Sequence, residues 1–175
     1  MKNQLRIIGG ESKRRILPFA SIDGLRPTPD RVRETLFNWL MWDIQNAQVL
    51  DICTGSGALG FEALSRGASS VYMIEPDKTQ ARFLKDNIEL LKAQNCHLIN
   101  TTAQQALPRL KEQFDVVFLD PPYSLDLWQE LSHHIADYLA KISLADLISR
   151  DNVQTVALRQ NVTGTDSALL SGTGI

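Results

Sequence analysis

Two short stretches of this sequence carry the residues best suited to chemistry. The first follows an apolar run and places Asp51 ahead of three glycines, Gly55, Gly57 and Gly60, in the pattern G-x-G-x-x-G. Glycines let a backbone turn tightly and approach a bound ligand closely. Glu75 lies 20 residues beyond Gly55, where a carboxylate can accept hydrogen bonds from ribose hydroxyls. This pattern predicts a loop that binds a nucleotide or a nucleoside.

The position of Asp51 bears on which ligand this loop binds. The glycine pattern alone fits a dinucleotide oxidoreductase. A carboxylate four residues before Gly55 would crowd a pyrophosphate, but it could hold a cationic ligand with an amino group, directly or through water. S-adenosylmethionine carries both a sulfonium and an amino group. We therefore favour S-adenosylmethionine as the cofactor, and a dinucleotide oxidoreductase is the alternative that the glycines leave open.

The second stretch, Asp120-Pro121-Pro122-Tyr123, follows another apolar run. Its prolines fix the backbone and remove N–H donors, but their carbonyls still accept hydrogen bonds. The Asp120 carboxylate and the Pro121 carbonyl could accept the hydrogens of a planar amine while the Tyr123 ring stacks on the attached base. Accepting those hydrogens orients the nitrogen lone pair and stabilises the charge that develops as the amine attacks an electrophile. The two stretches together predict an amino methyltransferase.

Composition sets the class of protein around these motifs. The chain has 175 residues, of which 43% are hydrophobic and 22% charged, as in ordinary single-domain proteins. No apolar run approaches the roughly 20 residues that span a bilayer. Two cysteines, Cys53 and Cys96, make neither a disulfide framework nor a metal set. We expect a cytoplasmic, monomeric protein with reduced thiols, no metal and no membrane attachment.

The charge is distributed unevenly along the chain. The net charge is −2, but residues 1–33 carry eight bases and three acids and are therefore +5. This excess predicts a polyanionic partner that binds at the N-terminal end, and a solvated basic surface without a partner is the alternative.

The pattern of elements indicates how the two motifs are positioned. Residues 5–8 and 14–17 could form a hairpin. Thr28 suits the N-cap of the next helix and Pro29 its first position, with Val32, Leu36 and Leu40 on one face. Strands and helices then alternate. We expect strands at Val49–Cys53, Val71–Ile74, His97–Asn100 and Val116–Leu119, and helices from Ala58 to Gly67, through Ala81–Leu91 and through Leu127–Ile142. This alternation predicts an α/β fold with a mostly parallel, doubly wound sheet, which binds ligands at the carboxyl ends of its strands.

Several longer segments resemble one known family, the bacterial 16S rRNA guanine-N2 methyltransferases that modify guanine 966 of the small ribosomal subunit. The resemblance covers roughly residues 5–145, and the run from Asp30 to Leu40 is its most specific part. The matching segments are 6–10, 25–28, 30–40, 55–60, 62–67 and 120–123. The resemblance implies a Rossmann-like class I methyltransferase with a small N-terminal basic hairpin. It also implies methyl transfer from S-adenosylmethionine to the exocyclic N2 amine of a guanine in 16S rRNA.

The resemblance also implies a role for individual residues. Asp51, Thr54, Gly55 and Gly57 would line the methionine end of the cofactor, Glu75 would hold the ribose, and Ala103 would contact the adenine. Asp120 and the Pro121 carbonyl would hold the guanine amine, and Tyr123 would stack on the base. Phosphates of the RNA would be contacted by Arg6, Lys13, Arg14, Arg15 and Arg26.

The C-terminal part departs from the family pattern. We expect a basic RNA-contacting arm over residues 1–28, a methyltransferase domain over 29–150 and an atypical tail over 151–175. Only Val153–Leu158 in that tail could make a strand, so the edge of the sheet would be incomplete. Such an edge predicts lower stability than in the relatives, or pairing with a second copy. The alternatives to rRNA methylation are methylation of DNA adenine or protein glutamine, or RNA binding with impaired catalysis.

Overall fold

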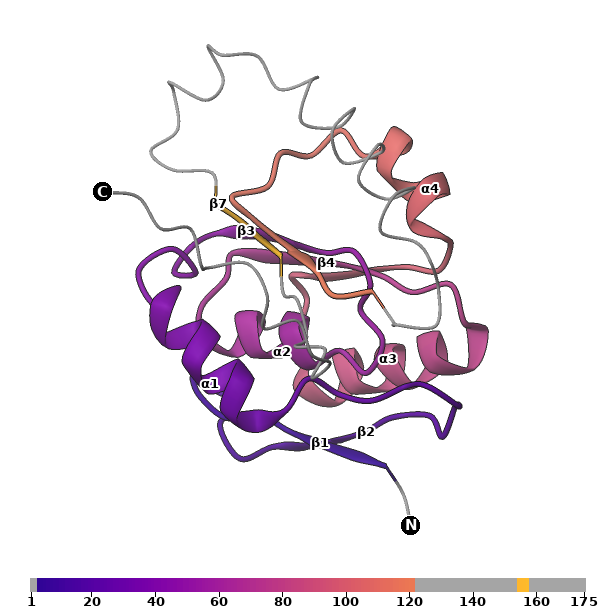
Figure 1. Ribbon diagram of the computed structural model, residues 1–175, viewed down its shortest axis with the longest axis horizontal. Helices are drawn as coiled ribbons and strands as arrows, with labels where there is room; N and C mark the ends of the chain where they lie inside the picture. Colours follow the sequence, from indigo (N-terminus) through magenta and orange to yellow (C-terminus); the bar gives the residue numbers. More distant parts are fainter. Residues whose placement is uncertain (1–2, 122–153, 158–175) are drawn as a thin grey trace, which may run out of the picture.

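The computed structural model describes residues 3–121 and 154–157, which are arranged around a parallel sheet (Figure 1). The chain begins with a hairpin in which β1 (Gln4–Arg6) pairs antiparallel with β2 (Ile16–Pro18). The predicted hairpin is therefore confirmed, with its second strand ending one residue later than expected.

The helix α1 (Asp30–Trp39) starts differently from the prediction. Pro29, rather than Thr28, is its N-cap, because the extended Pro29 residue (ψ 145°) accepts the first helical hydrogen bond from the Arg33 N–H at 3.0 Å. The Thr28 hydroxyl does not cap α1, and its hydrogen-bond partner lies far away along the sequence. The N-cap prediction for Thr28 is wrong because the helix begins one residue later than predicted, and the Thr28 hydroxyl instead donates a hydrogen bond to Asp120.

Of the three residues predicted to face the core from α1, Leu36 and Leu40 are buried and Val32 is not. Val32 is 43% exposed, whereas the adjacent Arg33 is fully buried. The side chains that face the core lie at Arg33, Leu36, Phe37 and Leu40. Hydrophobic spacing alone could not find Arg33 on this face, because a buried cation needs buried partners.

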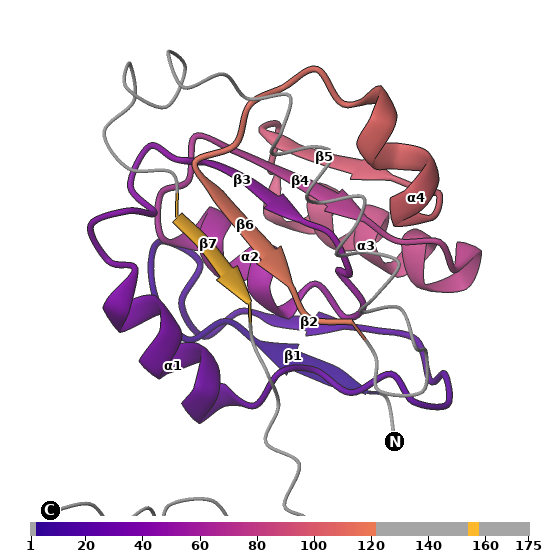
Figure 2. The ribbon, with the colours of Figure 1, turned by 45° about the horizontal axis from the view of Figure 1, so that its top comes forward.

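Strands and helices then alternate as predicted. The elements in order are β3 (Gln48–Asp51), α2 (Ala58–Ser65), β4 (Ser70–Ile74), α3 (Lys78–Leu91), β5 (Cys96–Ile99), α4 (Ala103–Ala106), the 3₁₀ turn η1 (Leu107–Arg109), β6 (Val116–Leu119) and β7 (Gln154–Ala157). The strands pair in the order β5-β4-β3-β6-β7, and every neighbouring pair is parallel (Figure 2). The predicted mostly parallel α/β sheet is confirmed, as is the strand in the tail. The predicted helix over Leu127–Ile142 lies outside the described residues.

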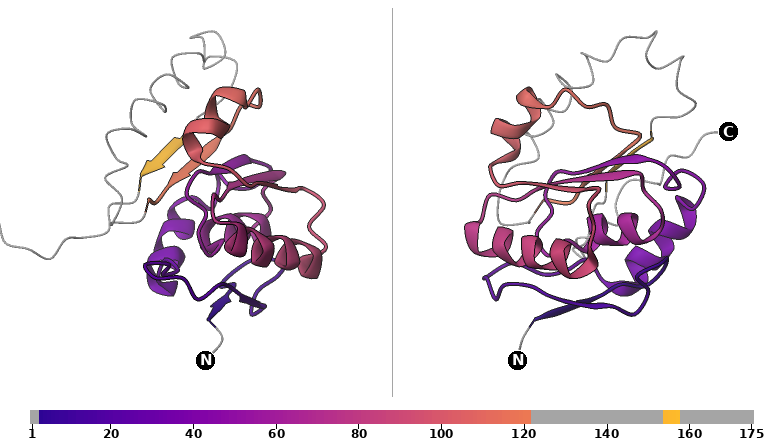
Figure 3. Two further views of the ribbon diagram at one scale, coloured as in Figure 1. Left: turned by 90° about the vertical axis from the view of Figure 1, so that its right-hand side faces the viewer. Right: turned by 180° about the vertical axis from the view of Figure 1, so that it is seen from behind.

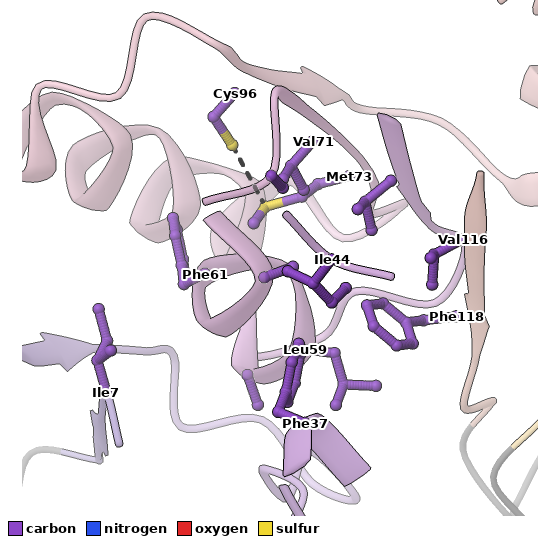
Figure 4. Close-up of a cluster of buried hydrophobic side chains, with 14 of the residues drawn as sticks. Ile7, Phe37, Ile44, Leu59, Phe61, Val71, Met73, Cys96, Val116 and Phe118 are labelled. Atoms are coloured by element: carbon purple, nitrogen blue, oxygen red, sulfur yellow. Dashed lines mark hydrogen bonds between the residues drawn. The ribbon is translucent and has the colours of Figure 1, made fainter. Parts of the chain in front are cut away.

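The sheet has helices on both faces. The hairpin, α1, α2 and α3 lie on one side, and α4 lies on the other (Figures 1 and 3). Strand residues alternate between the two sides: Val116 and Phe118 pack toward α1 and α2, and Val117 and Leu119 pack toward α4. Figure 4 shows the larger core, in which Phe37, Phe61 and Phe118 are among the buried side chains. Each such side chain contributes roughly 1.5–3 kcal/mol by leaving water.

The N-terminal arm is fixed to α2 through backbone hydrogen bonds. The carboxylate of Glu62, which is fully buried on α2, accepts from the Ile8 N–H at 2.9 Å and from the Gly9 N–H at 2.8 Å. Gly10 has a φ of +75°, and a Cβ at that position would lie 1.7 Å from the Ser65 carbonyl oxygen. Only glycine permits this close approach. The basic hairpin is therefore held on the same body as the sheet.

Candidate active site

Three carboxylates meet at one edge of the sheet because the register aligns the strand ends. Asp51 on β3 pairs with Met73 of β4 and with Phe118 of β6. Glu75 and Asp120 each stand two residues beyond those partners, past the carboxyl ends of their strands. Ligands of parallel sheets bind at this edge. Residues that are 69 positions apart in the chain are therefore brought to one place.

A cavity of about 720 Å³ opens at this edge, a volume within the range of small-molecule sites. Its wall comes from the ends of β3, β4 and β6, from the start of α4, and from the loop between β2 and α1. Seven of the residues predicted to contact the cofactor or the amine line it: Asp51, Thr54, Gly55, Glu75, Ala103, Asp120 and Pro121. Gly57 does not line it, and Tyr123 lies outside the described residues.

Asp51 is the most perturbed of the three acids. Its side chain is buried, and its Oδ2 accepts from the Gly60 N–H at 3.1 Å. Its Oδ1 has no hydrogen-bond partner among residues 3–121 and 154–157. Burial raises the pKa of Asp51 to about 7; the Gly60 hydrogen bond lowers it, while the charges of Asp120 and Glu75 raise it further. A buried carboxylate oxygen without a donor needs a cation or a donor from a ligand.

The glycine loop holds its shape through a second acid. Glu75 accepts from the Gly55 N–H at 2.9 Å and from the Asp77 N–H at 2.8 Å, so its carboxylate is oriented from both sides. Burial and the neighbouring Asp77 charge raise the pKa of Glu75, and the two N–H bonds oppose this. The Thr54 hydroxyl donates to the Asp51 carbonyl at 2.9 Å and closes the turn. Each Glu75 oxygen still has lone-pair capacity for a further donor.

Gly57 lies at the turn from the glycine loop into α2. It is the N-cap of α2 with a φ of +83°, and a Cβ there would lie 2.5 Å from the Phe61 ring. Glycine is needed at this turn because the backbone is left-handed and because the Phe61 ring leaves no room for a side chain. Gly57 is not among the residues that line the cavity, and its predicted contact with the cofactor stays a prediction.

Two residues of this site were missed by sequence reasoning. Gln80 is buried, donates to the Gly55 carbonyl at 2.7 Å and accepts from the Ala20 N–H at 2.8 Å, so it ties the glycine loop to the N-terminal segment. Thr28 donates its hydroxyl to Asp120 Oδ2 at 3.0 Å. A polar residue amid an apolar helix face was the only signal for Gln80. Nothing local signals the contact of Thr28, since its partner is 92 residues away.

The predicted RNA-contacting residues are exposed, and of the five only Arg26 lines the cavity. The turn that carries Lys13, Arg14 and Arg15 is bonded to Ser65 at the C-terminal end of α2, whereas the cavity lies at the N-terminal end of that helix. Lys13, Arg14 and Arg15 are exposed in and beside the hairpin turn, and Arg26 is exposed at the cavity wall. Arg6 forms an exposed salt bridge to Asp30 at 2.9 Å.

Of the two cysteines, Cys53 lines the cavity and Cys96 lies in the core. Burial raises the pKa of both thiols, Cys53 and Cys96, to about 12, so neither is a thiolate at neutral pH. Both cysteines are unpaired. Within the described residues, no group of three or more His, Cys, Asp or Glu side chains is placed so that it could hold a metal ion, and no helix there is long and apolar enough to cross a membrane.

Comparison with known proteins agrees with this geometry. A sequence model of the family described as "Conserved hypothetical protein 95" matches residues 5–164. The ribosomal RNA small subunit methyltransferase D of Haemophilus influenzae is 48% identical over 133 residues, which cover 74% of this chain and 69% of the relative. The protein of the same name from Escherichia coli K12 is 46% identical over 134 residues, covering 77% and 68%. A solved structure of a putative methyltransferase from Escherichia coli has a TM-score of 0.70 at 46% identity, covering 78% of this chain and 75% of that one.

The fold and the site define a Rossmann-like class I methyltransferase. The chain belongs to the Conserved hypothetical protein 95 family, which it shares with the ribosomal RNA small subunit methyltransferase D proteins.

Proposed function

We propose that this protein transfers a methyl group from S-adenosylmethionine to the exocyclic N2 amine of a guanine in 16S rRNA of the small ribosomal subunit. Its relatives are named as small-subunit rRNA methyltransferases. The observation that carries the proposal is the unpartnered Asp51 oxygen in the wall of a cavity that also contains Asp120. One acid is suited to a cationic cofactor, and the other to an amine substrate.

The residues present fit S-adenosylmethionine. Asp51 Oδ1 is buried without a donor, which suits the ammonium group of the methionine end, directly or through water. Glu75 would accept from ribose hydroxyls, and Ala103 would pack against the adenine ring. Three neighbouring carboxylates would repel an anionic pyrophosphate, and this argues against the dinucleotide alternative. S-adenosylmethionine would supply an electrophilic methyl carbon, whose bond to sulfur breaks as the amine nitrogen bonds to it.

The protein's contribution is to position the amine. Asp120 and the Pro121 carbonyl would accept hydrogen bonds from its two N–H groups, so that the nitrogen lone pair points toward the cofactor. The nitrogen gains positive charge as it bonds to carbon, and the Asp120 carboxylate would stabilise that charge and take up the proton. An exocyclic amine is weakly basic, so alignment matters more than base strength. Alignment of two reactants can lower a barrier by up to about 7–11 kcal/mol.

The RNA would contact the exposed cations of the N-terminal arm. Lys13, Arg14, Arg15 and Arg26 are exposed, and the first three are carried on a hairpin that Glu62 fixes to α2. A fixed set of cations can orient the RNA backbone while a single unstacked base enters the cavity. We place the protein in the cytoplasm, where its substrate is made.

Methyl transfer from labelled S-adenosylmethionine to small ribosomal subunits lacking the modification tests this function. Wild type is compared with Asp120→Ala and with Asp86→Asn, a matched change of an exposed carboxylate on α3. We expect label on one guanine N2, located by mass spectrometry, which is lost in Asp120→Ala and kept in Asp86→Asn. Label on DNA or on a protein glutamine would refute the substrate. Cofactor binding without any label would instead favour an RNA-binding protein with impaired catalysis.

A further inference from the structure

The cavity carboxylate Asp120 contacts a residue that lies 92 positions earlier in the chain. The Thr28 hydroxyl donates to Asp120 Oδ2 at 3.0 Å, and the Thr28 side chain is buried. Phe118 packs on the side of the sheet that faces α1. If that alternation continues past β6, the Asp120 side chain also projects toward α1, whose preceding loop carries Thr28.

The backbone around Thr28 is unusually restricted. Pro27 and Pro29 flank it, and each proline ring fixes its own φ near −65°. A residue before a proline is also held in the extended region, so Thr28 itself has few accessible conformations. Its hydroxyl is thereby presented toward Asp120 before any ligand arrives, at little further cost in conformational entropy.

A buried arginine, Arg33, forms a hydrogen bond with the Thr28 backbone. Arg33 Nε donates to the Thr28 carbonyl at 3.1 Å. The same guanidinium donates to the Arg6 carbonyl at 2.9 Å, and it pairs with Asp30 at 2.6 Å and with Glu62 at 3.4 Å. Because Arg33 is fully buried and bonded in four directions, it links the loop before α1 to the arm and to α2. The position of Thr28 is thus determined by two helices rather than by its loop alone.

We infer that Thr28 is a positioning residue for Asp120 and that Arg33 anchors it. A carboxylate can rotate about its Cβ–Cγ bond, and a donor on Oδ2 fixes the plane in which the group presents itself to an amine. The inference rests on the proposed function, in which Asp120 accepts a hydrogen bond from the substrate amine. Thr28 also lines the cavity, but in this scheme it acts through its hydrogen bond to Asp120, so its hydroxyl affects the rate of transfer more than ligand affinity.

The test compares three variants in the methyl-transfer assay. Thr28→Val keeps the shape and removes the hydroxyl, Thr28→Ser restores the hydroxyl, and Thr35→Val is a matched control on α1, where the Thr35 hydroxyl bonds only to the Arg31 carbonyl in the described structure. We expect Thr28→Val to lower kcat roughly 10- to 100-fold, since small misplacements cost this much, with KM for cofactor and RNA within about twofold. Thr28→Ser should recover most of kcat, and Thr35→Val should match wild type.

Several results would overturn the inference. These are a wild-type kcat in Thr28→Val, an equal loss in Thr28→Ser, or a parallel loss of cofactor affinity and melting temperature in Thr28→Val. If wild type methylates no RNA, the proposed function fails instead. Crystal structures of wild type and Thr28→Val then decide the contact directly. An Asp120 carboxylate with the same orientation in both structures would overturn the inference, and a rotated carboxylate in Thr28→Val would support it.

Discussion

Asp51 should make the ligand-free protein less stable as the pH rises. Its folded-state pKa is about 7 because burial disfavours the charged carboxylate, whereas an unfolded chain has the ordinary value of 3.8. Between these two pH values the folded protein binds more protons than the unfolded chain. Ionisation of Asp51 therefore favours unfolding, and stability falls as the pH rises from about 4 to about 7 and then levels off.

The size of the effect follows from the difference between the two pKa values. Relative to its value at low pH, the free energy of unfolding is lower by about 2 kcal/mol at pH 5 and by about 4 kcal/mol above pH 7. Asp51→Asn removes the charge and keeps an oxygen that can accept from the Gly60 N–H. The variant should therefore gain stability over wild type, and the gain should widen by about 2–3 kcal/mol between pH 5 and pH 8.

Urea unfolding of both proteins at pH 5 and pH 8, without cofactor, measures this gap. Asp86→Asn is the control, because it removes an exposed carboxylate on α3 and should show no widening. A gap for Asp51→Asn that stays constant between the two pH values would refute the reasoning, since it would mean that Asp51 is solvated in the folded protein. A destabilised variant at pH 8 would refute it as well.

Two further predictions concern the supports of the site. Glu62→Gln should destabilise the protein by about 3–5 kcal/mol in urea unfolding, because it leaves the buried Arg33 with a weaker partner; Glu34→Gln, on the exposed side of α1, should have no such effect. An equal effect of the two changes would contradict the buried ion pair. Gly57→Ala should lower stability by about 1–3 kcal/mol from its left-handed backbone alone, and the clash with the Phe61 ring adds to this. An unchanged melting temperature would show that the loop before α2 can relax.

The parallel sheet could be predicted because its signals are local. Apolar runs bounded by glycine or acidic residues fixed β3, β4 and β6 within a residue or two, and Gly67 correctly marked the end of α2. In a parallel sheet such runs imply carboxyl ends at one edge. The convergence of Asp51 and Asp120 was therefore predictable before any coordinates.

The tertiary structure alone decided how these acids are held and that the pKa of Asp51 is raised. No local pattern shows that Arg33, within an amphipathic helix, is a fully buried hub, or that Thr28 serves Asp120 rather than the helix beside it. The raised pKa of Asp51 likewise depends on how completely the surrounding elements exclude water. Residue type and spacing determine which groups can do chemistry, because they act through the local backbone. Burial and long-range hydrogen bonds set the pKa and the orientation of those groups, because they depend on residues that meet only in the folded chain.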